Sequence, residues 1–205
     1  MQKIVVGSNL IIGLDEVGRG CLAGPMVAVA AAFHDIPKPT DLAQLTDSKK
    51  LSEEVREKLF GILMWHVGDF GVGYVSAEDI DVMGMTAAWN YTCLAALEEL
   101  HPKIPATYKT KLVVDGRDEV PRYDYPQEAV VKADLKVWQV SAASVIAKVL
   151  RDRDMKYLSE FYPEYRWSVN KGYGTKDHQE AILKYGPTPL HRRLFLRKLL
   201  GREAD

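Results

Sequence analysis

The feature that most constrains the fold of this chain is a pair of apolar segments joined by a glycine-rich turn. The segments Leu10–Glu16 and Met26–Phe33 have the length and composition of buried strands, and Gly18–Pro25 lies between them. The first strand ends in two carboxylates, Asp15 and Glu16. We therefore expect two buried strands to open the fold, with acidic side chains placed beside the turn that joins them.

The rest of the chain alternates predicted strands and helices. Three further strands are predicted at Phe70–Val75, Lys111–Asp115 and Glu128–Lys132. Helices are predicted from Ser52 to about Val67, from a capping box at Ser76 through Met85–Leu100, from Val140 to Phe161, and over Thr175–Tyr185 and Pro189–Leu200. The polar residues of the Val140–Phe161 helix form one stripe: Ser141, Ser144, Lys148 and Asp152. The pattern predicts an α/β fold with a mixed layer over residues 1–160 and a small helical subdomain over residues 161–205.

Composition excludes several classes of protein. With 47% hydrophobic residues the chain is not a disordered one, and its longest apolar run has eight residues, too few to span a membrane. Its two cysteines, Cys21 and Cys93, form neither a CxxC pair nor a zinc pattern, which suits a reducing compartment. The N-terminal residues do not have the pattern of a secretory signal. We expect a soluble cytoplasmic protein that works as a monomer.

Charge is distributed unevenly along the chain. The net charge of −1 does not by itself indicate nucleic-acid binding. Residues 166–198, however, carry a net charge of +6, and the remaining residues carry −7. A basic C-terminal quarter on an acidic body can bind a polyanion, although a solvated helical face gives the same pattern.

Four carboxylates fall at predicted strand ends. Asp15 and Glu16 end the first strand, Asp115 ends the fourth, and Asp134 follows the fifth. Strand ends are where α/β sheets place their sites, and crowded carboxylates raise one another's pKa unless a cation lies among them. Oxygen ligands favour Mg²⁺ or Mn²⁺, and two such ions about 3.5–4 Å apart can clamp a phosphodiester. Alternatively, the acids only solubilise the strand ends.

One geometric condition applies to the adjacent acids. Neighbouring residues on a regular strand point to opposite faces of the sheet. Asp15 and Glu16 can therefore reach one metal cluster only if the strand is already breaking at Glu16.

Two glycine-rich segments suggest contact with a sugar or phosphate. Gly18–Gly24 comes close to a dinucleotide fingerprint, but it leads into a strand instead of a helix, and the preceding carboxylates would repel a pyrophosphate. Close approach of the backbone to a sugar or phosphate is the better interpretation. In Lys171–Thr175, Tyr173 lies between glycines and is placed to stack on a sugar or base, or the segment is an ordinary loop before a helix capped by Thr175.

Basic residues near these segments are candidates for phosphate contacts. They are Lys49, Lys50, Lys148, Lys171, Arg192 and Arg193, together with His191. Binding through such contacts should weaken steeply with salt, because each neutralised phosphate releases counterions.

Several motifs in order resemble a known family. They are Gly13–Gly20 (GLDEVGRG), Leu22–Pro25 (LAGP), Asp47–Leu51 (DSKKL), Val114–Gly116 (VDG), Lys132–Asp134 (KAD), Ser141–Arg153 (SAASVIAKVLRDR), Lys171–Thr175 (KGYGT) and His191–Arg193 (HRR). The chain thereby resembles the type 2 ribonucleases H, and within them ribonuclease HII. The sister family, ribonuclease HIII, is less similar because it typically has lysine in place of Arg19 and lacks Tyr173.

The resemblance implies a fold, an activity and a site. The fold is an RNase H-like mixed five-stranded sheet flanked by helices, with a catalytic domain over residues 1–160 and a basic helical subdomain over 161–205 that contributes to substrate binding. The activity is Mg²⁺- or Mn²⁺-dependent hydrolysis of RNA in RNA/DNA hybrids and at ribonucleotides embedded in duplex DNA, by two metal ions. The implied metal-binding and catalytic carboxylates are Asp15, Glu16, Asp115 and Asp134. The implied readers of the ribose are Gly18, Arg19 and Gly20, and Tyr173 would stack on the sugar at the RNA–DNA junction.

The chain departs from the family pattern at three positions. Cys21 stands where proline is common, Val17 where alanine is common, and Ala133 where glycine is common. None of them removes a chemical group that the implied mechanism needs. Two other classes of function stay open, a hybrid-binding module without catalytic activity and a nucleotide-dependent oxidoreductase that binds a dinucleotide at the Gly18 turn.

Overall fold

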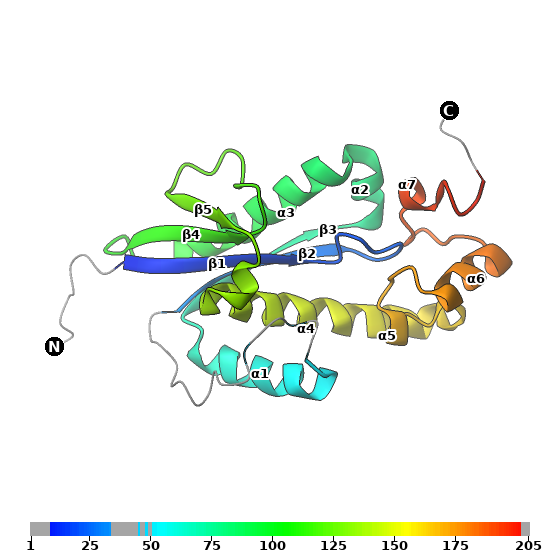
Figure 1. The fold of residues 1–205 in the computed structure, drawn as a ribbon, viewed down its shortest axis with the longest axis horizontal. Coiled ribbons are helices and arrows are strands. Elements are labelled where there is room, and N and C mark those ends of the chain that lie inside the picture. The colour runs from blue at the N-terminus through cyan, green and yellow to red at the C-terminus, as the bar shows by residue number, and fades with distance from the viewer. Residues whose placement is uncertain (1–8, 34–44, 46–47, 49–50, 202–205) are drawn as a thin grey trace.

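The computed structural model describes residues 9–33, 45, 48 and 51–201, and within them the chain forms one mixed sheet covered by helices on both faces (Figure 1). The sheet has five strands in the order β3-β2-β1-β4-β5. Their bounds are Asn9–Val17 (β1), Met26–Ala32 (β2), Asp69–Val75 (β3), Lys109–Asp115 (β4) and Gln127–Val130 (β5). Strands β1, β2 and β3 pair antiparallel, whereas β4 pairs parallel with both β1 and β5. The predicted mixed five-stranded α/β fold is confirmed.

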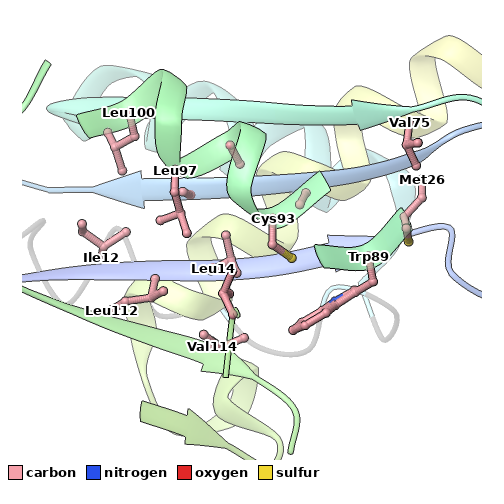
Figure 2. Packing of buried hydrophobic residues seen from close by; sticks show 14 of the residues in the cluster. Ile12, Leu14, Met26, Val75, Trp89, Cys93, Leu97, Leu100, Leu112 and Val114 are labelled. Carbon is pink, nitrogen blue, oxygen red and sulfur yellow. The ribbon is translucent and has the colours of Figure 1, made fainter. Parts of the chain in front are cut away.

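Two helical layers enclose the sheet. Helices α2 (Ala77–Met83) and α3 (Met85–Leu100) cover one face, and α1 (Glu53–His66) and α4 (Trp138–Phe161) cover the other (Figure 1). Alternation along the strands supplies both cores, because successive side chains point to opposite faces. Ile12, Leu14 and Leu97 belong to the cluster under α3 shown in Figure 2. Val27, Leu59 and Ile146 belong to the cluster under α1 and α4.

Glycines in β3 bring α3 unusually close to the sheet. A Cβ atom at Gly73 would overlap the backbone carbonyl of Thr92, and one at Gly71 would overlap that of Ala96. The two glycines in FGVGYV therefore have a packing reason, and they set how deeply α3 and its side chains lie over the strands.

The predicted helix from Ser76 through Leu100 is divided in the structure. Ser76 caps α2 as predicted, and its hydroxyl accepts a hydrogen bond from the Asp79 amide at 3.0 Å. Gly84 has φ 78°, a left-handed conformation that ends α2 and starts α3. The prediction of one continuous helix is therefore wrong, because Gly84 divides it into two.

Two other predicted elements are shorter than expected. Strand β5 ends at Val130, and Lys132 at φ 57° turns the chain into a 3₁₀ turn, η3 (Ala133–Leu135). In the C-terminal region only α7 (Arg193–Leu196) lies within the predicted Pro189–Leu200 helix. The other short elements there are η4 (Pro163–Tyr165), α5 (Trp167–Asn170) and α6 (Lys176–Tyr185).

The C-terminal helices pack on the turn between β1 and β2. Their hydrophobic cluster contains Trp167 and Ile182, and it also contains Ala23 from the turn and Met155 from α4. Figure 1 shows α5, α6 and α7 gathered at this end of the sheet. Because this cluster spans the predicted boundary, the division into residues 1–160 and 161–205 stays a prediction. Among the described helices, none is both long and apolar enough to cross a membrane.

Candidate active site

Asp15 and Asp115 lie side by side where the parallel pairing of β1 with β4 ends. The register sets Leu14 opposite Val114, so the next residue of each strand is a carboxylate. Asp15 is buried, and its pKa rises to about 8 because burial disfavours the charged form and because Glu16 and Asp115 add negative charge nearby. Hydrogen bonds from the Ser144 side chain and the Glu16 amide oppose this rise. The predicted meeting of strand-end acids is thus present for this pair.

Glu16 faces the other side of the sheet. Strand β1 continues regularly to Val17, and Glu16 pairs with Ala28, so the break that would turn both acids to one side is absent. Its carboxylate accepts a hydrogen bond from Trp89 Nε1 at 3.1 Å and lies 4.0 Å from Arg19 Nη1. Figure 2 shows Trp89 projecting from α3 over this end of the sheet.

Asp134 lies in η3, next to the end of β4. The Ala133 amide donates a hydrogen bond to Asp115 Oδ1 at 2.7 Å, which ties this turn to the strand-end carboxylate. Ser141 Oγ donates to the carbonyl of Asp134 and fixes the turn to the start of α4. The left-handed residue here is Lys132, so alanine in place of glycine at position 133 meets no left-handed strain.

The donor chemistry of this sheet end fits a hard divalent cation. Carboxylate oxygens are the ligands that Mg²⁺ and Mn²⁺ prefer, and a cation would offset the burial and the repulsion that raise the pKa of Asp15. In the side-chain positions of the residues described, no three acidic, histidine or cysteine side chains converge closely enough for one ion. Binding a cation here therefore requires side-chain movement, most of all at Glu16.

The turn after β1 requires glycine at position 18 but leaves position 20 open. Gly18 has φ 89°, and a Cβ atom there would overlap Arg151 Nε and the carbonyl of Pro25. Gly20 is exposed, and nothing lies within 4 Å of the position its Cβ would take. Arg19 is half exposed, with its guanidinium carbon 5.8 Å from the centre of the Trp89 ring. The turn thus presents one cation and an open glycine to solvent.

Two fully buried arginines hold this turn. Arg151 donates to the carbonyls of Pro25 at 2.8 Å and Ala23 at 3.1 Å. Arg192 donates to the carbonyl of Gly24 at 2.9 Å and to that of Arg19 at 3.0 Å. The structure therefore places Arg192 inside the protein, bonded to backbone carbonyls, and not on the surface where a phosphate contact was predicted.

The remaining predicted phosphate contacts differ in their accessibility. His191 is 1% exposed, and Lys171 is 7% exposed with Nζ donating to the Ser168 carbonyl. Lys148 is buried, and its Nζ lies 2.6 Å from Asp152 Oδ1. Arg193 is exposed. Lys49 and Lys50 lie outside the described residues.

Tyr173 lies beside the turn, and two basic side chains lie near its ring. Its ring centre is 5.7 Å from Lys148 Nζ and 5.9 Å from the guanidinium carbon of Arg151. Its pKa rises to about 12, chiefly because of burial. Tyr173 as a whole is half-buried, so part of the residue is accessible to solvent. The structure thus brings the predicted stacking residue next to the predicted glycine turn.

A polar network links α1 to α4, and the sequence predicted a role for Lys148 alone among its members, as a phosphate contact. Asp152 lies 3.4 Å from Arg56 Nη2 as well as 2.6 Å from Lys148, and Ser48 Oγ lies 2.9 Å from Ser144 Oγ. Ser144 in turn bonds Asp15. The signal was the polar stripe of α4, which indicates that one face of that helix is polar but not which partners it meets.

Comparison with known proteins agrees with the motifs and the fold. The family model described as Ribonuclease HII matches residues 12–198. A ribonuclease HII of Caldanaerobacter subterraneus subsp. tengcongensis is 41% identical over 95% of this chain and 77% of its own length. One from Fusobacterium nucleatum is 41% identical over 95% of this chain and 89% of its own length.

A solved structure gives the same result in three dimensions. The crystal structure of the ribonuclease H2 from Pyrococcus horikoshii has a TM-score of 0.74 to this chain at 32% identity. The similarity covers 94% of this chain and 98% of the other, so it includes both the sheet and the C-terminal helices.

Proposed function

This chain belongs to the ribonuclease HII family, whose members hydrolyse RNA in RNA/DNA hybrids, and we propose that it also cuts on the 5′ side of ribonucleotides embedded in duplex DNA. Membership confirms the resemblance seen in the motifs and makes the chain a metal-dependent endoribonuclease. The finer substrate, the number of ions and the residues that hold them are our proposal.

The observation that carries the proposal is the pairing of buried Asp15 with half-buried Asp115 beside it. They follow the last paired residues of the parallel strands β1 and β4, and burial together with the charges of Glu16 and Asp115 raises the pKa of Asp15 to about 8, so a bound cation would favour its ionised form. We assign Asp15, Asp115 and Asp134 as ligands of Mg²⁺ or Mn²⁺, and Glu16 as a ligand after it leaves Trp89. Two such ions, when bound, supply charge stabilisation at the phosphate and lower the pKa of the attacking water.

Backbone amides orient two of these ligands, Asp15 and Asp115. The Ala133 amide holds Asp115 from one side, and the Glu16 amide holds Asp15 Oδ1 at 2.8 Å. Carboxylates that are oriented before the substrate binds need little reorganisation during the reaction. Attack on the phosphorus 5′ of the ribonucleotide leaves a 5′-phosphate and a 3′-hydroxyl end.

The turn and Tyr173 supply the specificity in this proposal. A ribose differs from a deoxyribose only by its 2′-hydroxyl, so a reader must bring hydrogen-bonding groups close to that atom. Gly18 allows the tight turn, Gly20 is exposed and leaves its backbone accessible, and Arg19 lies between them for a flanking phosphate. The partly exposed ring of Tyr173 stacks on the neighbouring sugar. This support comes from the open space at Gly20 and the proximity of the two segments.

The biological role follows from the substrate. Cutting at embedded ribonucleotides starts their removal, so we assign the enzyme to DNA replication and repair. The partners are RNA/DNA hybrids and ribonucleotide-containing duplex DNA. Action as a monomer and a cytoplasmic location stay predictions.

Cleavage of a labelled DNA duplex with one embedded ribonucleotide tests the proposal. With Mg²⁺ or Mn²⁺ present, we expect one cut 5′ of the ribonucleotide and none with the Asp134→Asn variant. Cutting of long hybrids alone would contradict the roles given to Arg19 and Tyr173. Binding of both substrates without cutting would support the hybrid-binding module instead.

A further inference from the structure

Two histidines meet in the interior of the C-terminal region. His178 in α6 and His191 before α7 are 0% and 1% exposed, and their Nε2 atoms lie 3.2 Å apart. Each Nε2 atom can be a donor or an acceptor, so this contact is a hydrogen bond only if one of them carries a proton and the other does not.

The outer partners of the pair determine which nitrogen carries the proton. His178 Nδ1 lies 2.9 Å from the carbonyl of Tyr173, which can only accept, so Nδ1 is protonated and Nε2 of the neutral ring is an acceptor. His191 Nδ1 accepts from the Thr188 amide at 3.0 Å, so the proton of this neutral ring is on Nε2. The two assignments are complementary, and His191 donates to His178.

The surroundings leave no place for another proton. Trp167 Nε1 also donates to His178 Nε2, at 3.0 Å, and the Thr188 hydroxyl lies 2.9 Å from His191 Nδ1. A proton on His178 Nε2 would face two N–H groups, and one on His191 Nδ1 would face the Thr188 amide. The bonds described here therefore require both rings to be neutral.

The pair connects the two segments that are to contact the substrate. On one side it bonds the backbone of Tyr173. On the other side His191 forms a bridge with Ala23, and the amide of the next residue, Arg192, donates to the Leu22 carbonyl at 2.8 Å. The Arg192 side chain then reaches the Arg19 carbonyl at 3.0 Å. Hydrogen bonds from Tyr173 to His178 and His191, the peptide bond from His191 to Arg192, and the hydrogen bond from Arg192 to Arg19 thus connect the two segments.

We propose that His178 and His191 are positioning residues whose neutral hydrogen-bonded pair holds Tyr173 in register with the Gly18–Gly24 turn, and that protonation of either ring releases this register and weakens hybrid binding. The inference rests on the proposed function for the roles of Tyr173 and Arg19. The pair itself touches no substrate.

Burial outweighs the groups around the pair that favour its protonation, which are the backbone hydrogen bonds with Tyr173 and Thr188. Burial lowers the pKa of both rings, that of His191 to about 4, with repulsion between the two rings as a second cause for His191. The titratable group packed against them from η4 is Tyr165, whose ring centre lies 4.8 Å from His191. Arg192 directs its guanidinium to backbone carbonyls, and among the described residues no carboxylate shifts the pKa of either ring. The pair is intact above about pH 6.5, the pKa of a free histidine, and opens as the pH falls towards that of His191.

The first experiment needs no substrate. Imidazole ¹⁵N chemical shifts of the full-length protein report the tautomer of each histidine. We expect His178 as the Nδ1–H form and His191 as the Nε2–H form near neutral pH, with neither titrating at the pKa of a free histidine. Either ring protonated near neutral pH, or the reverse pair of tautomers, would overturn the inference.

The second experiment separates positioning from general stability. Binding of a fluorescent RNA/DNA hybrid in EDTA is measured for wild type and His178→Gln, with His101→Gln as the matched control. His101 also has a lowered pKa, but it follows α3, where its Nε2 bonds the Tyr123 hydroxyl. We expect His178→Gln to bind about tenfold more weakly at neutral pH, since a buried hydrogen bond is lost. This ratio should shrink towards one as acid opens the wild-type pair, while that of His101→Gln stays near one throughout.

The outcomes distinguish the two proposals. A His178→Gln defect that is the same at every pH would overturn the inference, and so would tight binding by this variant at neutral pH. The expected tautomers in a wild-type protein that binds no hybrid would overturn the proposed function, and with it the positioning role. If His178→Gln does not fold, the wild-type tautomers and the pH dependence of wild-type binding decide the matter: hybrid binding that does not weaken as the pH falls below about 6.5 would overturn the inference. Protonation of surface groups would instead tighten binding to a polyanion.

Discussion

Asp15 and Glu16 are neighbours in β1, yet their carboxylates lie on opposite faces of the sheet. Asp15 meets Ser144 of α4 on one face, and Glu16 accepts a hydrogen bond from Trp89 of α3 on the other. The pairing of β1 with β2 continues past both residues to Val17, so the strand itself separates them. A metal site that includes both acids must therefore form around the end of the sheet, and Asp115 is the acid that the strand register places beside Asp15.

The burial of Asp15 predicts a stability that depends on pH and metal. Its pKa is raised from 3.8 to about 8, so ionisation costs folding free energy. In the metal-free protein, the stability that protonated Asp15 contributes is fully present below about pH 4 and is lost as the pH rises through about 8. Asp15→Asn should raise the unfolding temperature of metal-free protein at neutral pH, by about 2–4 °C for each kcal/mol recovered.

Metal ions should make wild type, and not Asp15→Asn, the protein with the higher unfolding temperature. We expect Mn²⁺ to raise the unfolding temperature of wild type and to have much less effect on Asp15→Asn, because the cation binds only the ionised site. Differential scanning calorimetry with and without Mn²⁺ checks this. An equal shift in both proteins would show that the ion binds elsewhere.

Glycines 18 and 20 should respond differently to the same substitution. Gly18→Ala places a Cβ against Arg151 at a left-handed φ, so we expect a loss of about 1–3 kcal/mol in the free energy of unfolding. Gly20→Ala meets open space and should leave stability within about 0.5 kcal/mol while weakening hybrid binding. Urea unfolding and hybrid titration separate the two effects. Normal binding by Gly20→Ala would remove this glycine from the substrate surface.

Asp152 should be important for stability because it faces two buried cations. Asp152→Asn leaves Lys148 and Arg56 without their counter-charge, for which we expect a loss of about 3–5 kcal/mol in urea unfolding. Asp177→Asn is the matched control, since its ion pair with Arg166 is exposed and should contribute less than about 1 kcal/mol. Equal losses in the two variants would contradict the buried network.

The salt dependence of hybrid binding should identify which cations touch phosphate. Arg193 is exposed, so Arg193→Ala should lower the slope of log Kd against log salt by about 0.9. Lys171 is nearly buried and bonds the Ser168 carbonyl, so Lys171→Met should leave the slope unchanged. A lower slope for Lys171→Met alone would show that Lys171 contacts phosphate and that Arg193 does not.

Local patterns predicted most of the fold. The alternation and length of apolar runs placed all five strands, and Ser52, Ser76 and Thr175 cap the helices they were expected to begin. The division at Gly84 was missed because a glycine between two helix-forming segments shows its conformation only when the segments pack. Lys132 likewise takes a left-handed conformation that no property of lysine predicts.

The sequence predicted which residue types gather at the site, but not where each side chain points. Strand ends indicated where the acids would gather, and the parallel register brings Asp15 and Asp115 together. The position of Arg192 depends on a bridge between His191 and Ala23, which are far apart in the chain, so no local pattern reveals that its side chain is buried.

The most direct test of the catalytic assignment compares two aspartates on one segment. Asp115 ends β4 beside Asp15, whereas Asp118 is exposed three residues later. With Mn²⁺ and a uniform RNA/DNA hybrid, Asp115→Asn should cut at least about 10²–10³-fold more slowly than wild type, and Asp118→Asn should cut at the wild-type rate. Wild-type cleavage by Asp115→Asn would contradict the assignment of this sheet end as the active site.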